Sequence, residues 1–178
     1  MLAVSAICLA TAACAPGGAT LTPASNPALA SQGWQDAHLS LPGVAYGTHF
    51  DKFLICKTAS CGGPGFVMAG YKPLPGNLAT SYRLLMTNRQ ITDAKLLAAL
   101  QVSFATSPVV AAINGQVTSA HKTPTSMAAT VTCNKSFPVA GKVDCVGRVT
   151  ITEDRISIQL GGGPTPAKAR ERLRMAGG

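Results

Sequence analysis

The cysteines offer the most covalent chemistry in this chain of 178 residues. Cys8 and Cys14 lie in an uncharged first stretch, and four more lie further along: Cys56, Cys61, Cys133 and Cys145. An even number of cysteines in an exported domain favours disulfides. Of the three pairings that four cysteines allow, we favour the local one, Cys56 with Cys61 and Cys133 with Cys145, because turn residues lie between the members of each pair.

A zinc site is the competing use of these cysteines. The spacing C-x4-C, followed much later by C-x11-C, lacks the close second pair that is typical of a zinc ribbon. A redox role has less support, since no C-x-x-C is present. We therefore expect no metal ion and no cofactor.

Acid–base chemistry has few candidates. The chain has three histidines at well-separated positions: His38, His49 and His121. None has the spacing of a metal-binding helix such as H-E-x-x-H, and His49, two residues before Asp51, is the best candidate for a base. Glu153 and Asp154 are adjacent, so on a strand they would point to opposite faces, and we interpret them as a hairpin turn. We assign no catalytic residue.

The beginning of the chain carries a targeting pattern. Leu2 to Ala13 is an uncharged apolar run, too short to cross a bilayer but of the length of a signal-peptide core. It ends in T-A-A-C, small residues directly before Cys14, and this resembles the lipobox of bacterial lipoproteins. The resemblance implies cleavage before Cys14, acylation of that cysteine with palmitate-type chains, and, with Ala15 following, sorting to the outer membrane. The alternative is cleavage after residues 28–30, A-L-A, which would give a soluble periplasmic or secreted protein.

Composition divides the chain into three parts. Residues 1–13 are expected to be the signal peptide, and residues 14–33, rich in Ala, Gly, Pro, Ser and Thr, the lipid anchor and a flexible linker. Residues 34–178 are expected to form a single globular domain, of a size that can bury a core.

Periodicity predicts an α+β fold. Two short strands should flank the Cys56–Cys61 loop, a third should cover 81–87, and a helix should begin after Thr92. Residues 108–113 fit either a short helical turn or a buried strand. Alternating apolar residues over 125–134, 142–152 and 155–160 predict three antiparallel strands, and 167–176 a short basic helix. The glycine-rich stretches 62–65 and 161–164 are expected to be turns. The predicted class is an antiparallel sheet with a C-terminal meander, covered by one or two helices and braced by disulfides.

The net charge of +8 belongs to the part of the chain after residue 35. The predicted basic patch lies near the end of the chain: Lys168, Arg170, Arg172 and Arg174. Nucleic acid is not expected as a partner, because neither aromatic nor helix-turn-helix signatures accompany the charge. We expect a cell-envelope lipoprotein of binding or scaffolding type, attached to the membrane by its lipid anchor, with an envelope protein or an anionic polymer as partner. The alternative is a small periplasmic enzyme acting on envelope polymers through His49 or His121.

Overall fold

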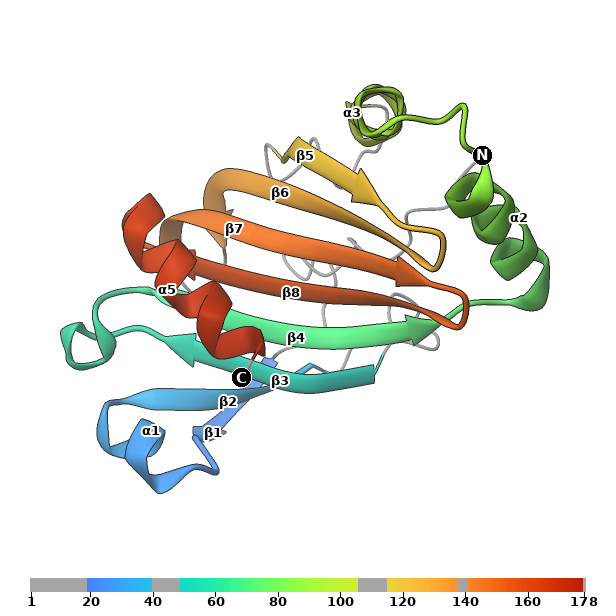
Figure 1. The fold of residues 1–178 in the computed structure, drawn as a ribbon. Coiled ribbons are helices and arrows are strands. Elements are labelled where there is room, and N and C mark those ends of the chain that lie inside the picture. The colour runs from blue at the N-terminus through green and yellow to red at the C-terminus, as the bar shows by residue number, and fades with distance from the viewer. Residues whose placement is uncertain (1–18, 40–48, 106–114, 138–140, 178) are drawn as a thin grey trace.

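The computed structural model describes residues 19–39, 49–105, 115–137 and 141–177. Within them, eight strands form one sheet (Figure 1): β1 (Ala19–Pro23), β2 (Trp34–Leu39), β3 (His49–Cys56), β4 (Gly65–Pro73), β5 (Gln116–Lys122), β6 (Ser126–Phe137), β7 (Gly141–Thr152) and β8 (Arg155–Gly163). The helices are α1 (Pro27–Ser31), α2 (Gly76–Thr87), α3 (Asp93–Ala105) and α5 (Pro166–Gly177), with a 3-10 turn at Ala59–Cys61.

The sheet joins two meanders that are far apart in sequence. Its order is β1-β2-β3-β4-β8-β7-β6-β5, and every neighbouring pair is antiparallel. Strand β4, the last of the first meander, pairs with β8, the last of the second. The predicted antiparallel sheet with two disulfides is therefore confirmed, and strands outnumber helices in the described part of the chain.

The C-terminal meander follows the predicted alternation. Strands β6, β7 and β8 pair in sequence, and Glu153 and Asp154 form the turn between the last two. The expectation of a turn at 161–164 was wrong for its glycines. Gly161, Gly162 and Gly163 belong to β8 and are buried, and the strand ends before Pro164, because a proline cannot donate to the ladder.

One predicted strand is a helix in the structure. Residues 81–87, predicted as a strand, belong to helix α2, whose Tyr82 and Met86 face a core shared with Leu96 of α3 and Met127 of β6. Tyr82 and Met86 are four residues apart, a spacing that fits one face of a helix as well as one face of a strand. Their packing against α3 and β6 favours the helix. Helix α3 begins as predicted, with the Thr92 hydroxyl accepting from the N–H of Lys95. Residues 108–113 lie outside the described ranges.

The expectation of a flexible linker up to residue 33 was wrong for residues 19–33. Strand β1 pairs along its length with β2, and α1 follows with Asn26 as its N-cap. Ala24 is buried, and its N–H donates to the carbonyl of Trp34. Pairing with β2 gives the backbone N–H and C=O groups of β1 hydrogen-bond partners. The amino-acid composition of the segment does not reveal such partners. Residues 1–18, with the predicted signal peptide and Cys14, lie outside the described residues.

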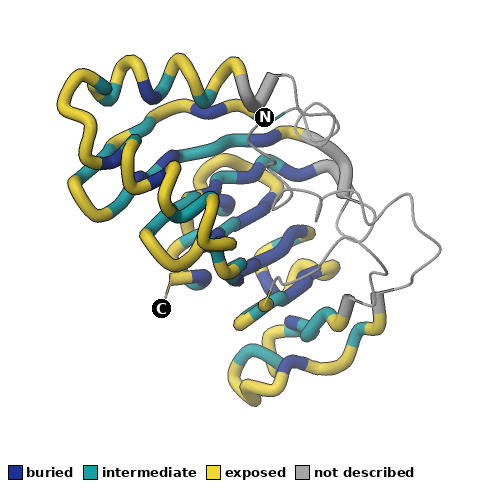
Figure 2. Tube along the Cα trace, turned by 90° about the vertical axis from the view of Figure 1, so that its right-hand side faces the viewer, coloured by how far each residue is buried: buried dark blue, intermediate teal, exposed yellow. Residues whose placement is uncertain are grey.

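Helix α5 crosses one side of the sheet over β8, β4 and β7 (Figure 1). It approaches closely because β8 offers Gly161, where a Cβ atom would clash with backbone atoms of Ala169 and Leu173. Ala169 and Ala176 of α5 are buried, and Figure 2 shows buried positions concentrated along the strands. On the opposite side of the sheet, a second cluster includes Ile55, Phe66 and Ile158. In the described part of the chain, no helix combines the length and the apolar composition needed to cross a bilayer.

Candidate functional site

The two disulfides have the local pairing that the sequence favours. Cys56 at the end of β3 is joined to Cys61, with 5.9 Å between their Cα atoms, and closes the loop to β4. Cys133 of β6 is joined to Cys145, its direct partner in the register with β7, at 4.9 Å between Cα atoms. All four residues are buried. These bonds therefore brace the fold at both halves of the sheet and leave no free thiol among the described residues.

Arg172 of α5 is the one charged residue among the buried residues of the described chain, with 2% of its surface exposed. Its guanidinium donates hydrogen bonds of 2.7 to 3.1 Å to four backbone carbonyls: those of Cys61, Gly63, Pro64 and Gly162. Its central carbon also lies 5.0 Å from the centroid of the Trp34 ring. Arg172 thus ties the disulfide loop, β8 and β2 to the C-terminal helix.

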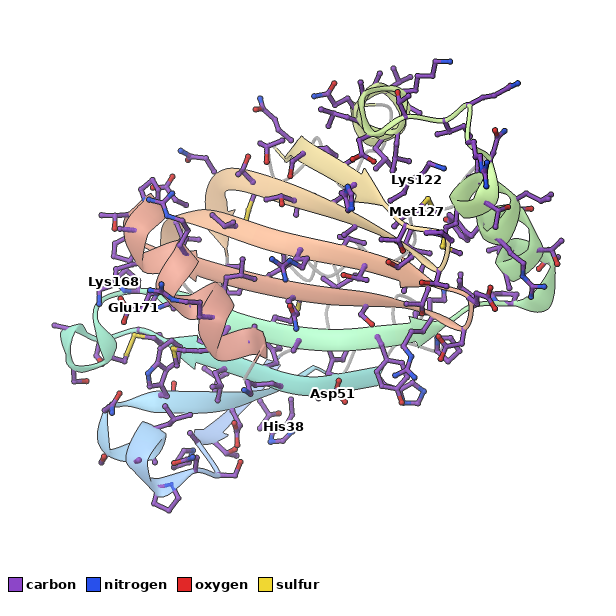
Figure 3. The ribbon with its side chains drawn as sticks, in the orientation of Figure 1. His38, Asp51, Lys122, Met127, Lys168 and Glu171 are labelled. Atoms are coloured by element: carbon purple, nitrogen blue, oxygen red, sulfur yellow. A yellow bond between two sulfur atoms is a disulfide. The ribbon has the colours of Figure 1, made fainter. Side chains whose placement is uncertain are left out.

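This position corrects the predicted basic patch. The side chain of Arg172 does not lie at the surface, because its N–H groups are satisfied by backbone carbonyls, three of them in the loop between β3 and β4. Burial lowers the pKa of its guanidinium from the ordinary value, and Glu171 opposes that effect. The other members, Lys168, Arg170 and Arg174, are partly or fully exposed, and Lys168 pairs with Glu171 at 2.8 Å near the start of α5 (Figure 3).

An open groove of about 840 Å³ lies where β2, β3 and β4 meet beside α1. It brings His38 of β2 and Tyr71 of β4 to His49 and Asp51 of β3, and Figure 3 shows His38 and Asp51 on neighbouring strands. Asp51 falls at an irregularity of register between β3 and β4. A bulge of this kind re-aims a side chain, which explains how Asp51 reaches the groove.

The rings of the groove are stacked on one another. The imidazole of His49 stacks on Tyr71 with centroids 5.0 Å apart, and the guanidinium carbon of Arg155 lies 5.4 Å from the centroid of the same Tyr71 ring. Neither Asp51 nor any other carboxylate of the described residues lies within ion-pair distance of His49. The groove can therefore offer hydrogen bonds and a ring surface to a ligand, but His49 and Asp51 do not form an acid–base pair.

The third histidine has a carboxylate partner. His121 Nδ1 of β5 lies 2.6 Å from Asp93 Oδ2 at the start of α3, and the other oxygen of Asp93 accepts from the N–H of Lys122. These two hydrogen bonds, first that of His121, hold the pKa of Asp93 below its ordinary value. The ammonium of Lys122 in turn donates to the carbonyls of Leu85 and Met86 at the end of α2, and to that of Asn88 just after the helix at 2.6 Å. The hydrogen bonds of Asp93 with His121 and Lys122 thus hold the start of α3 against β5, the edge strand of the sheet.

The remaining acidic residues that the sequence singled out serve the hairpin. Asp154 accepts from the Thr152 hydroxyl at 2.6 Å and from Arg155 Nε at 2.9 Å, and these bonds lower the pKa of Asp154. Glu153 lies 3.6 Å from Arg83 of α2. No group of three or more His, Cys, Asp or Glu side chains in the described ranges is placed to hold a metal ion.

No protein-family model, no curated protein and no solved structure matches this chain. Sequence reasoning missed Tyr71, whose role depends on its neighbours across β3 and β8, and Arg148, an exposed residue in the middle of β7. One feature of the sequence pointed to Arg148. It occupies a polar position in a run in which apolar and polar residues alternate, so it is expected on the polar face of the strand.

Proposed function

We propose that the protein is a cell-envelope lipoprotein of the binding or scaffolding type, anchored by acylated Cys14, with its domain in the periplasm at the outer membrane. The observation that carries the proposal is the pair of buried disulfides in a chain whose beginning resembles a lipoprotein signal. Structural disulfides persist in oxidising compartments such as the periplasm and are rare in the cytosol. The same compartment is the one that the lipobox pattern implies.

An anchor at Cys14 would hold the domain close to the lipid. Strand β1 begins at Ala19, so residues 15–18 would be the whole tether. Five residue steps from Cys14 to Ala19 span at most about 18 Å when fully extended. By comparison, the flexible linker that the composition predicts over the nineteen residues 15–33 would reach about 25 Å. The β1 end of the sheet would therefore face the membrane closely.

The proposal includes the groove beside α1 as a ligand site and the helices as covers of the sheet. Support for the groove comes from its size and from the polar and aromatic side chains that line it. Sites for small molecules commonly combine such a concavity with a few polar groups. Support for the cover comes from α5, which packs on β4, β7 and β8, and from α2, which contributes Tyr82 and Met86 to a core with β6.

The intact mass of the full chain, purified from the membranes of a Gram-negative host, tests the anchor. We expect a mass that corresponds to cleavage before Cys14 plus acyl chains, with four thiols appearing after reduction only. A Cys14→Ser variant should lose the acyl mass and leave the membrane fraction. An unprocessed chain with free thiols in the wild type would contradict the proposal.

A small periplasmic enzyme acting on envelope polymers is a second candidate, and the 2.6 Å contact between His121 and Asp93 favours it. A carboxylate that orients a histidine is a common arrangement for a general base. In that case purified protein should release soluble fragments from peptidoglycan, and His121→Ala should abolish the release while His38→Ala keeps it. No release by the wild type would leave the binding function as the better account.

A further inference from the structure

One side of β6, β7 and β8 presents hydroxyl groups beside α5. Residues directly opposite in antiparallel strands, and alternate residues along each strand, share a face. The register therefore groups six polar side chains around Arg148, and we call them the hydroxyl face: Thr130, Thr132, Thr150, Thr152, Ser157 and Gln159. This is the side of the sheet on which α5 lies, and Figure 1 shows that α5 leaves much of β6 and of the adjoining half of β7 uncovered.

Arg148 stands in the middle of this face. In the register it lies between Thr130 on β6 and Gln159 on β8, with neighbouring strands about 4.8 Å apart. Its side chain is exposed, and none of the described residues forms a hydrogen bond or an ion pair with it. The charge of Arg148 is therefore available to a ligand that lies on the hydroxyl face.

Two more arginines border the face from α5. Arg172 turns toward the loop between β3 and β4, and each residue of a helix advances by about 100°, so Arg170 and Arg174 lie on the side of α5 that is turned away from that loop. Gly177 shares that side, and a Cβ atom there would lie 3.4 Å from Nε2 of Gln159. Both arginines are exposed and have no hydrogen bond or ion pair within the described ranges.

Four acids near the face have a hydrogen-bond partner of their own: Asp93 with His121, Asp144 with Asn134, Asp154 with Thr152, and Glu171 with Lys168. Asp51, which lines a small pocket with Ser157 and Gln159 at the border of the face, has no hydrogen-bond partner among the described residues. No carboxylate of the described chain pairs with Arg148, Arg170 or Arg174. The face therefore carries positive charge next to hydroxyl and amide groups.

We propose that the hydroxyl face, together with Arg148, Arg170 and Arg174, binds a phosphorylated glycan. Guanidinium groups match phosphate oxygens in charge and in paired geometry. Threonine and serine hydroxyls and the Gln159 amide can both donate to and accept from sugar hydroxyls. The proposal relies on the proposed function for the source of that glycan, the cell envelope.

The same surface fits other polyanions less well. Single-stranded nucleic acid is usually bound by aromatic side chains on which bases stack. On this side of β6, β7 and β8 the register places no aromatic residue among the described ones, and Tyr71 of β4, opposite Ser157 at the border, already stacks on His49. A surface that inserts into a membrane exposes large apolar side chains, and the face offers only Ala128 and Val146 among its polar groups.

Calorimetric titration of the full chain in non-ionic detergent tests the proposal. The probe is the lipid-free, phosphorylated core oligosaccharide of lipopolysaccharide, and its control is the same oligosaccharide after dephosphorylation. We expect saturable binding that weakens about tenfold or more without phosphate, because charged hydrogen bonds are lost. Binding should also weaken as salt is raised, since the arginines are exposed.

Variants locate the site. Arg148→Gln and the double variant Arg170→Gln/Arg174→Gln should each weaken binding about fivefold or more. Arg89→Gln, which removes the same charge from the turn after α2, should change it less than about twofold. Thr150→Val, which removes a hydroxyl at nearly constant shape, should weaken it about two- to threefold. Unchanged thermal melts establish that each variant is folded.

Several outcomes would overturn the proposal. These are arginine variants that bind as the wild type does, equal binding of the dephosphorylated oligosaccharide, binding to phosphatidylglycerol vesicles without binding to the oligosaccharide, and tighter binding to a single-stranded DNA oligomer. The intact mass at Cys14 is independent of all of them. Failure of glycan binding and failure of the lipid anchor are thus distinguishable.

Discussion

Arg172 and Arg148 lie on the same side of the sheet but in opposite environments. Arg172 is 2% exposed and donates to four carbonyls, whereas Arg148 is exposed and has no partner among the described residues. Three of the four carbonyls belong to the loop between β3 and β4, whose backbone has no strand beside it. Around Arg148, the ladders with β6 and β8 already use the backbone groups. An irregular loop can therefore bury an arginine, while a regular sheet leaves it at the surface for a ligand.

The largest expected effect is that of Arg172→Met. It would leave two buried and two partly buried carbonyls without this donor, and we expect a loss of about 3 to 5 kcal/mol in the free energy of unfolding. Urea denaturation followed by the fluorescence of Trp34, which lies against Arg172, measures it. The matched control is Arg148→Met, which should stay within about 0.5 kcal/mol of the wild type. Equal losses in the two variants would remove the contrast between the two arginines.

Removal of each disulfide should have the next largest effects. The bond between Cys133 and Cys145 spans 12 residues and that between Cys56 and Cys61 spans 5. Chain entropy predicts losses of about 3 and about 2 kcal/mol for the paired alanine variants. Urea denaturation of the two variants gives the comparison. A larger loss for the shorter loop would show that its carbonyls hold Arg172 only while the bond is closed.

Gly161→Ala tests the close approach of α5 to β8. A Cβ atom would clash with the backbone of α5, so we expect a loss of about 1 to 3 kcal/mol. Gly76→Ala is the control, because a Cβ atom at this position, at the start of α2, would have no other atom within 4 Å. A Gly161→Ala protein as stable as the control would mean that α5 can shift without cost, and the position of Arg172 would need another explanation.

The smallest expected effect concerns Asp93, at the far end of the sheet from Arg172. Its pKa is lowered in the folded state by His121 and by the N–H of Lys122, so it stabilises the fold above its unfolded pKa. That contribution is lost as the pH falls through the folded pKa. Asp93→Asn should therefore lower Tm slightly at pH 7, and the difference should be smaller at about pH 2.

Thermal melts by circular dichroism at both pH values measure this difference. Asp51→Asn is the control, since no described residue donates a hydrogen bond to Asp51. A difference for Asp93→Asn that persists at low pH would indicate that the hydrogen-bond geometry, rather than the charge, holds α3 to β5.

Local patterns determined much of the architecture. Alternation predicted β6, β7 and β8, the capping residue Thr92 predicted the start of α3, and turn residues between nearby cysteines predicted both disulfides. These features depend on neighbours within a few residues along the chain. For the same reason, the α2 segment was misread, because its few apolar positions suit either period until Leu96 and Met127 pack against them.

The tertiary structure alone decided which charges are buried and which strands meet. The sequence groups Arg172 with Arg170 and Arg174, but the pairing of β4 with β8 brings the carbonyls of a loop more than a hundred positions away to its guanidinium. Pairing with β2 likewise turned an uncharged, linker-like stretch into β1. Such contacts are made by backbone N–H and C=O groups, which nearly every residue carries, so the residue types in the sequence do not predict them. They can be identified only from the assembled sheet.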